Sequence, residues 1–354
     1  MHIVLVGGGH AHLGVVHEAA RFHRVGLSLT LVDAGDFCYS GMATGMLAGC
    51  YSMADASIDL AQLCAAFGVR HIAAQVLDVD RQQQTLILSD GQALGYDLVS
   101  FNVGSVAAHW SPENSRPEGA ALWPVKPITE LSRFIAVFEQ SLTAGISPSV
   151  TVVGDGVTAA EVAANIAYRV TAAGLQPRVQ IQMQGPTLAK QLPAGAQQAL
   201  KHYLLTQGVT LINQGAVTAS DHMIWAAGLQ APPLMQRLGL VNHPVQGLAV
   251  HSTWQSLSDK RVFAIGDCAY IASMPLAKLG VHGVRGALVL TRNLLAAAQG
   301  LPLKAYRPRA FYLSILHLSP SMGLAVFGRF WWLGRYSRYV KDWIDRRFMA
   351  AMRP

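Results

Sequence analysis

Charged side chains are scarce in this sequence. Asp, Glu, Lys and Arg make up 13% of its 354 residues, whereas hydrophobic residues make up 51%. A composition with so little charge excludes a chain that is disordered throughout. The length leaves room for roughly two to three folded units with sizeable cores.

Cysteine is also rare, and no cysteines are paired in a motif. The four are Cys38, Cys50, Cys64 and Cys268, and the sequence has no CxxC. Their spacing excludes a zinc ribbon or finger, and we predict no metal site. The histidines of the His10-Ala11-His12 motif lack a third ligand at a suitable spacing, so we interpret them as packing or phosphate-proximal residues. We expect free thiols in a reducing cytoplasm.

Long apolar runs are absent too. No uninterrupted apolar stretch reaches the roughly 18 residues of a spanning helix. The sequence opens on a predicted strand, residues 1–6, so we expect no signal peptide. The net charge of +7 comes mainly from residues 329–353, which hold seven basic and two acidic side chains. A basic tail without a zinc-finger, homeodomain or RNP-type pattern sets nucleic-acid binding aside.

Two stretches read as strand, glycine turn and helix. They run from Ile3 to about Ala20 and from Val150 to about Val170, and an apolar strand follows each of them. Two such starts predict an α/β fold with two nested, doubly wound Rossmann-like domains. We predict a discontinuous first domain of residues 1–110 and 247–310, a shortened second domain of residues 111–246, and a C-terminal segment of residues 311–354.

The first glycine turn has the residues that a dinucleotide needs. Gly7 permits a tight turn out of the strand, and Gly9 lets backbone N–H groups approach a pyrophosphate at the helix N-terminus. Asp33 ends the next strand, where an acid accepts the ribose hydroxyls. His12 stands in place of the usual third small residue, a departure that would loosen the packing of helix on strand.

A later apolar strand, within residues 262–269, ends in Gly266-Asp267. Such a strand presents the Asp267 carboxylate at the edge of a sheet, where it can bond a polyol hydroxyl. Gly266 admits the backbone close to the ligand. We therefore predict that this strand end and the first glycine turn hold opposite ends of one nucleotide.

Five motifs in order carry a family resemblance. They are GGGHAH at residues 7–12, YSGM at 39–42, NVG at 102–104, GDGVTAAE at 154–161 and FAIGDCA at 263–269. Together they resemble the FAD-dependent pyridine nucleotide oxidoreductases with two dinucleotide-binding domains. Within that family the sequence looks most like the type II NADH:quinone dehydrogenases and the FAD domains fused to selenide, water dikinase. The similarity runs from residue 3 to about residue 349.

The resemblance implies two cofactor sites and two catalytic residues, Glu161 and Lys278. The implied FAD site consists of Gly7, Gly9, His10, Ala11, His12, Asp33, Ser40, Gly41, Met42, Val76, Asn102, Gly104, Gly266, Asp267, Lys278 and Gly280. The implied NAD(P) site consists of Gly154, Gly156, Ala159, Glu161 and Gly228. The helix that opens after Lys278 would stabilise negative charge on the reduced flavin. The reactive cysteine pair of dithiol and sulfide:quinone reductases is not evident, because eleven residues separate Cys38 and Cys50.

The second glycine turn departs from the family pattern in two ways. Residues 182–185 read Gln-Met-Gln-Gly where the ribose acid is expected. Residues 216–220 run almost directly into the following strand, so the usual β-meander is trimmed. Arg178 precedes its strand and is poorly placed for a 2′-phosphate. A vestigial domain that no longer binds nicotinamide therefore remains an alternative.

The C-terminal segment changes to aromatic and basic residues. Residues 311–327 read as a strand pair with a break at Ser319-Pro320-Ser321. From Trp332 onward, apolar residues recur on one helical face, at positions 332, 336, 339, 340, 343, 344 and 348, with Arg335, Arg338, Asp342, Asp345 and Arg346 opposite. This pattern predicts an amphipathic helix whose apolar face lies in a membrane interface or packs on its own domain or on the second subunit of a homodimer.

The function expected from these features is hydride transfer from NAD(P)H to FAD and on to a quinone-like acceptor. The location expected is the cytoplasm or the inner face of the membrane. One alternative is a flavin oxidoreductase that acts on a small organic or sulfur/selenium substrate without efficient use of NAD(P)H. Another is a non-enzymatic, FAD-stabilised binding or assembly partner.

Overall fold

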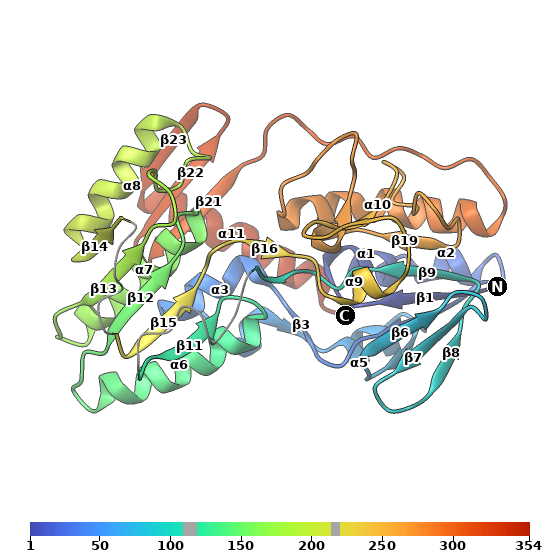
Figure 1. The fold of residues 1–354 in the computed structure, drawn as a ribbon, viewed down its shortest axis with the longest axis horizontal. Coiled ribbons are helices and arrows are strands. Elements are labelled where there is room, and N and C mark those ends of the chain that lie inside the picture. The colour runs from blue at the N-terminus through green and yellow to red at the C-terminus, as the bar shows by residue number, and fades with distance from the viewer. Residues whose placement is uncertain (109–118, 214–219) are drawn as a thin grey trace.

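Two five-stranded parallel sheets form the framework of the molecule, each in its own lobe (Figure 1). The computed structural model describes residues 1–108, 119–213 and 220–354. The first sheet has the order β19 (Val262–Ala264), β9 (Leu98–Phe101), β1 (His2–Val6), β2 (Ser28–Val32) and β5 (Arg70–Ile72). Its central strands are mostly apolar and buried because helices cover the sheet, whereas the edge strand β5 is polar and more exposed. Helix α1 (His10–His17) packs directly against α10 (Gly280–Ala298).

Four strands of the second sheet repeat this order, and its outer strand comes before them in the chain instead of after. The sheet consists of β11 (Ala121–Pro124), β15 (His222–Trp225), β12 (Ser149–Val153), β13 (Arg178–Gln182) and β14 (Val209–Ile212). Its helices are α6 (Ile128–Thr143), α7 (Val157–Ala172) and α8 (Ala194–Thr206). The two sheets confirm the predicted fold class of two doubly wound units. The predicted domain boundaries stay a prediction, and the one near residue 110 lies outside the described residues, as do most of residues 216–220.

Smaller elements connect the two sheets. After β5, β6 (Val76–Asp80) opens an antiparallel meander with β7 (Thr85–Leu88) and β8 (Ala93–Gly95). The remaining short elements are α2 (Ala19–His23), β3 (Phe37–Cys38), α3 (Ser40–Leu47), α4 (Met53–Ala56), β4 (Ser57–Ile58), α5 (Leu60–Ala66), β10 (Val106–Ala107), β16 (Leu229–Gln230), α9 (Leu234–Arg237), β17 (Asn242–His243), β18 (Gly247–Ala249), η1 (Gly266–Cys268) and β20 (Ala269–Tyr270). The pair β10–β16 links the end of β9 to the end of β15.

The C-terminal segment is a three-stranded antiparallel sheet followed by a helix. The expected strand pair is present as β21 (Ser314–Ser319) and β22 (Met322–Phe327). A third strand, β23 (Phe330–Gly334), was not expected. Trp332 lies on β23, so the prediction that the helix includes it is wrong: α11 is Arg335–Met352. Aromatic residues suit strands as well as amphipathic helices, which is why their spacing misled.

Helix α11 packs with its polar side inward. Ser337, Arg338, Lys341 and Asp345 are buried, whereas Tyr336, Tyr339 and Trp343 are 61%, 63% and 60% exposed. The expectation that Arg338 and Asp345 face solvent is therefore wrong. The exposed part of the apolar face does not pack on the described part of this chain, whereas Phe348 near its end packs on His10, Phe37 and Tyr39. For the exposed part, a membrane interface or a second subunit stays the prediction. Among the described helices, none is long and apolar enough to cross a membrane.

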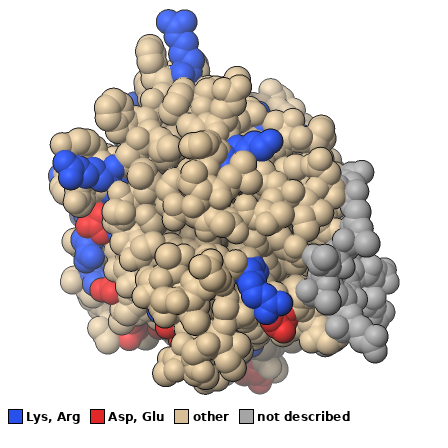
Figure 2. Space-filling view, turned by 90° about the vertical axis from the view of Figure 1, so that its left-hand side faces the viewer, with Lys and Arg blue, Asp and Glu red and all other residues tan. Residues whose placement is uncertain are grey.

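The end of the molecule formed by the second sheet carries few charges. Figure 2 shows only scattered Lys, Arg, Asp and Glu side chains on this face. No broad basic patch forms on its described part, so the positive charge of the chain is not gathered there.

Candidate functional site

One cavity connects the two glycine turns. Its volume is about 670 Å³, and its lining residues come mainly from the loops and helices that follow the strands of both sheets. The predicted site residues on its wall are Gly9, His10, Asp33, Ser40, Gly41, Asn102, Gly104, Gly156, Glu161, Gly228, Gly266, Asp267, Lys278 and Gly280. The other predicted site residues do not line the cavity; they are Gly7, Ala11, His12, Met42, Val76, Gly154 and Ala159. Residues from segments far apart in the sequence thus meet in a single space.

The first turn has the geometry expected of a nucleotide cradle. Gly7 has a φ of +89°, which favours glycine, and its N–H donates to the carbonyl of Val32 at 2.9 Å. The N–H of Gly8 donates to the Asp33 carboxylate at 2.6 Å. Asp33 is thereby fixed at the strand end with part of its carboxylate facing the cavity. This position suits a ribose acceptor.

Asn102 ties the first turn to two neighbouring strands. Its Oδ1 accepts from the N–H groups of Ala11 at 3.0 Å and His12 at 3.4 Å, and its Nδ2 donates to the carbonyl of Ile265 at 2.8 Å. The N–H groups of Ala11 and His12 are therefore already bonded. Their predicted direct contact with the cofactor is not supported, and the donors left at this helix N-terminus lie nearer to Gly9.

His12 strengthens the packing that it was expected to loosen. Its ring is fully buried, Nδ1 donates to the carbonyl of Gly7 at 2.7 Å, and Nε2 accepts from the hydroxyl of Ser100 at 2.8 Å. Burial lowers the pKa of His12 to about 4, against the opposing effect of the Gly7 carbonyl. The ring is accordingly neutral at physiological pH and acts as a bridge between turn and sheet.

His10 points elsewhere, so the two histidines do not form one site. Its ring packs against Phe37, Tyr39 and Phe348, with centroids 5.0, 5.6 and 5.6 Å away. Desolvation lowers its pKa to about 4, although Asp267 opposes this effect. His10 is therefore a neutral ring at the cavity wall.

The Gly266-Asp267 strand end carries a charged cluster. Asp267 Oδ2 accepts from Ser105 Oγ at 2.7 Å and from Lys126 Nζ at 2.9 Å. Burial alone would raise the pKa of Asp267, but Lys126 and Ser105 outweigh it and hold the pKa below its ordinary value. Lys278 donates to the carbonyls of Asp267 and Gln246, and desolvation lowers its pKa. Ser105 and Lys126 belong to no local motif, so neither residue could be predicted as part of the site.

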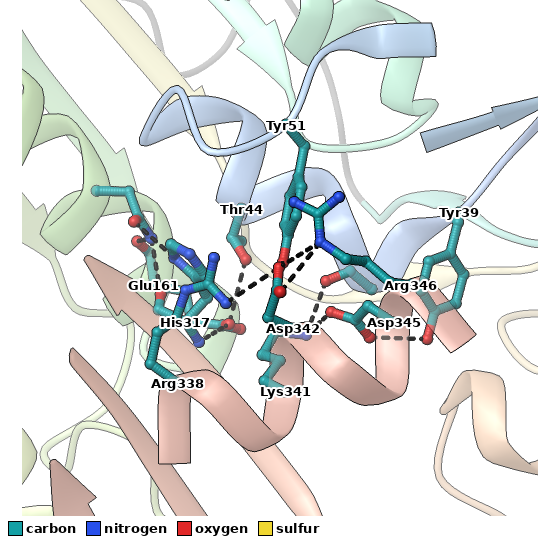
Figure 3. A network of polar contacts seen from close by, with 12 residues as sticks. Tyr39, Thr44, Tyr51, Glu161, His317, Arg338, Lys341, Asp342, Asp345 and Arg346 are labelled. Atoms are coloured by element: carbon teal, nitrogen blue, oxygen red, sulfur yellow. Dashed lines mark hydrogen bonds and ion pairs between the residues drawn. The ribbon is translucent and has the colours of Figure 1, made fainter. Parts of the chain in front are cut away.

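Glu161 lines the cavity together with residues of both glycine turns. Its Oε1 accepts from the N–H of His317 at 2.7 Å and from Thr44 Oγ1 at 3.2 Å. Desolvation raises its pKa, against the lowering effect of Lys341. Figure 3 shows Glu161 and Lys341 in one polar network with residues of α3 and α11.

Lys341 lines the cavity, although it was not among the predicted site residues. Its Nζ donates to the carbonyl of Gly41 at 2.8 Å and to Asp345 at 2.9 Å, and Tyr39 donates to the same carboxylate at 3.1 Å. These bonds hold α11 against the N-terminus of α3. The buried polar side of α11 thus completes the cavity wall.

The second turn repeats the backbone of the first. Gly154 has a φ of +138°, and its N–H donates to the carbonyl of Gln182 at 2.9 Å. Gly228 has a φ of +73°, close to the +71° of its counterpart Gly104. Arg178 begins β13 and pairs with Ser149, so it lies at the opposite end of the strand from the turn. Its poor placement for a 2′-phosphate is confirmed.

Solved structures and curated proteins similar to this chain were found. The sulfide:quinone oxidoreductase of Aquifex aeolicus aligns with a TM-score of 0.83 at 16% identity, covering 99% of this chain and 91% of that one. The NDH2 of Plasmodium falciparum, in complex with NADH, aligns with a TM-score of 0.78 at 14% identity, covering 99% and 97%. At such identities the likeness shows the fold.

Among curated proteins, an NADH dehydrogenase-like protein of Mycobacterium tuberculosis is 23% identical over 60% of this chain, which spans only 58% of that relative. Ferroptosis suppressor protein 1 of Mus musculus is 23% identical over 88% of this chain and 84% of its own length. The family model described as pyridine nucleotide-disulphide oxidoreductase matches residues 1–287. The chain therefore belongs to the pyridine nucleotide-disulphide oxidoreductase family, a family of FAD-dependent oxidoreductases.

Proposed function

We propose that this protein is an NAD(P)H dehydrogenase that passes electrons through FAD to a quinone-like acceptor. The observation that carries the proposal is the single cavity shared by both glycine turns, with Glu161 on its wall. Hydride transfer needs the nicotinamide and the flavin in contact, and a shared cavity allows that contact.

The residues of the first site fit FAD. The turn offers the backbone N–H of Gly9 for a pyrophosphate, and Asp33, held by the N–H of Gly8, offers a carboxylate for ribose hydroxyls. At the other end, Asp267 lies at the cavity wall, ready to bond a polyol. Bound there, FAD supplies the two-electron chemistry that amino-acid side chains lack.

Two groups of this chain act on charge at the flavin end. The N-terminus of α10, at Gly280, faces the cavity and favours negative charge there. Lys278 and Lys126 lie beside it and add positive charge to the same wall. Together they stabilise an anionic ring relative to a neutral one.

Glu161 is proposed to exchange a proton with the reduced acceptor. A quinone takes up protons as well as electrons, and a carboxyl with a raised pKa holds a proton closer to neutral pH than an ordinary glutamate. The cavity touches both Glu161 and Lys341, so the proton and a nearby cation are available at one place.

Anaerobic mixing of the purified protein with NADH or NADPH tests the proposal. We expect loss of the flavin absorbance within seconds with at least one of the two nucleotides. A quinone added afterwards is expected to restore the absorbance faster than oxygen does. A coloured protein that dithionite bleaches and neither nucleotide bleaches would instead favour an oxidoreductase acting on a small organic or sulfur/selenium substrate, an alternative that the missing ribose acid at Met183 supports.

The exposed aromatic face of α11 is proposed to contact the membrane in which a quinone dissolves. Aromatic rings with arginines beside them suit the interface of an anionic bilayer. We expect Tyr339→Ser and Trp343→Ser together to abolish flotation with anionic liposomes and leave the melting temperature unchanged. Ile146→Ser, at a 58% exposed side chain elsewhere, is the control. Unchanged flotation of the double variant, or a dimer that α11 variants dissociate, would sink the membrane contact.

A further inference from the structure

Backbone hydrogen bonds identify the residue of the second lobe that stands at the position of Asp33. Asp33 donates its N–H to the carbonyl of Ile72 at 3.1 Å, and Met183 donates its N–H to the carbonyl of Ile212 at 2.9 Å. Both residues directly follow a strand whose last carbonyl accepts from the first glycine of a turn. Met183 therefore occupies the position of Asp33, and it is a buried apolar residue.

The second turn has an acid at a different position. The middle residue of the first turn is Gly8, whose N–H bonds Asp33. The middle residue of the second turn is Asp155, whose carbonyl accepts from the N–H of Ala189 at 2.6 Å. That bond holds the loop between β13 and α8 against the turn.

The carboxylate of Asp155 points to the strand end. Its Oδ2 lies 2.7 Å from the place where a Cβ on Gly185 would be. Gly185 follows Met183 by two residues, as Gly35 follows Asp33, and the N–H of Gly35 donates to Asp33 at 3.0 Å. In both lobes a carboxylate thus lies between the glycine turn and the third residue after the strand. In the first lobe the strand end supplies it, and in the second the turn does.

Within the described part of the chain, the Asp155 carboxylate has no hydrogen-bond or ion-pair partner, and it is only half-buried. Asp33, by contrast, is held by two backbone N–H groups. A carboxylate at this position without a protein partner is available to the hydroxyls of a bound nucleotide.

We propose that Asp155 is the ribose acceptor of the second site, moved from the strand end to the glycine turn. This rests on the proposed function. Asp155 accepts hydrogen bonds from the 2′- and 3′-hydroxyls of the adenosine ribose of NADH. Its charge opposes the 2′-phosphate of NADPH, which makes the enzyme specific for NADH. Lys190 would act in the opposite direction. It is an exposed cation on the loop between β13 and α8, and it would attract the 2′-phosphate of NADPH.

Binding measurements on the FAD-loaded protein test this assignment without turnover. Isothermal titration with NAD⁺, NADP⁺ and ADP-ribose is expected to give at least about tenfold tighter binding of NAD⁺ than of NADP⁺, the usual scale of a lost hydrogen bond to a charged group. In Asp155→Asn, NAD⁺ and ADP-ribose should bind about tenfold more weakly and NADP⁺ should not. Lys190→Gln is the matched control and should leave NAD⁺ binding unchanged.

A second pair of variants tests whether the ribose acid has moved from the strand end to the glycine turn. Asp155→Gly should weaken ADP-ribose binding as Asp155→Asn does, and adding Met183→Asp should restore it by rebuilding the arrangement of the first turn. If the double variant does not retain FAD, the NAD⁺ affinity of Asp155→Asn, compared with that of the unaltered protein, decides whether Asp155 binds the ribose. Equal NAD⁺ affinity in Asp155→Asn and the unaltered protein, or preference for NADP⁺, overturns this proposal alone. Absence of any nucleotide binding to the unaltered protein overturns the dehydrogenase proposal as well.

Discussion

The two glycine turns share a backbone but differ in the side chains behind it. Gly9 and Gly156 have nearly the same conformation, with φ and ψ of −69° and 170° against −81° and 172°. Asn102 stands behind the first turn, and Ala226 stands at the equivalent place behind the second, since each donates its N–H at 2.8 Å to the last carbonyl of the first strand. Asn102 fastens three segments together, whereas Ala226 fastens none by its side chain.

This difference suits two nucleotides with different residence times. A turn fixed by buried side chains is ready for a cofactor that stays bound, because little ordering remains to be paid on binding. A turn held mainly by its backbone leaves a shallower, more adaptable site. That suits a nucleotide which must enter and leave in every catalytic cycle.

Alanine at the two equivalent glycines gives the largest expected contrast. A Cβ on Gly9 would lie 2.4 Å from Asn102 Oδ1 and 2.6 Å from the Asn102 carbonyl oxygen, whereas a Cβ on Gly156 meets nothing within 4 Å. We expect Gly9→Ala to purify without flavin and Gly156→Ala to keep full flavin content, measured by absorbance. Retention of flavin in both variants would contradict the proposed difference between the two glycine turns.

Removal of the Asn102 side chain is expected to have the second-largest effect. Asn102→Ala leaves the N–H of Ala11 without a partner and the carbonyl of Ile265 with only the weak thiol donor of Cys268, and unsatisfied buried groups cost about 1–3 kcal/mol each. We expect the free energy of unfolding in urea to fall by about 2–4 kcal/mol. A loss below about 0.5 kcal/mol would show that Asn102 does not fasten the first turn.

Sequence alone located both turns because each depends on a local pattern. Gly9, Asp33 and Asp267 sit at fixed spacings around a strand end, so their places on the cavity wall could be foreseen. The position of Glu161 followed from the family resemblance. Ser105, Lys126 and Lys341 reach the cavity through contacts with partners 141 to 300 residues away in the chain, as for Lys126–Asp267 and Lys341–Gly41. No local spacing encodes such pairs.

The orientation of α11 could not be foreseen for a related reason. Periodicity identifies an apolar and a polar face but not which of them is buried. The usual assumption puts the apolar face inward. Here Lys341 and Asp345 pair with each other and with Gly41 and Tyr39, so the polar face is buried with its hydrogen bonds made.

The smallest expected effect concerns pH. His12 occupies the place that Ala159 has in the second turn. Its pKa is about 4 in the folded chain and 6.5 in the unfolded chain, so the unfolded chain binds the proton first. Its contribution is therefore fully present above pH 6.5 and is lost as the pH falls to 4, by up to about 3 kcal/mol.

His12→Ala, which copies the second turn, should flatten the slope of unfolding free energy against pH between 6.5 and 4 by close to one proton. Urea denaturation at half-unit steps measures this slope. An unchanged slope would mean that His12 is not the neutral bridge between Gly7 and Ser100.

Rapid mixing of the flavin-loaded protein with NADH deuterated at nicotinamide C4 tests most directly whether both turns serve one reaction. Flavin bleaching should be fast with ordinary NADH and slower with the deuterated form, because the transferred hydrogen comes from C4. Absence of bleaching in a correctly folded, yellow sample, with NADPH equally inert, would contradict the account.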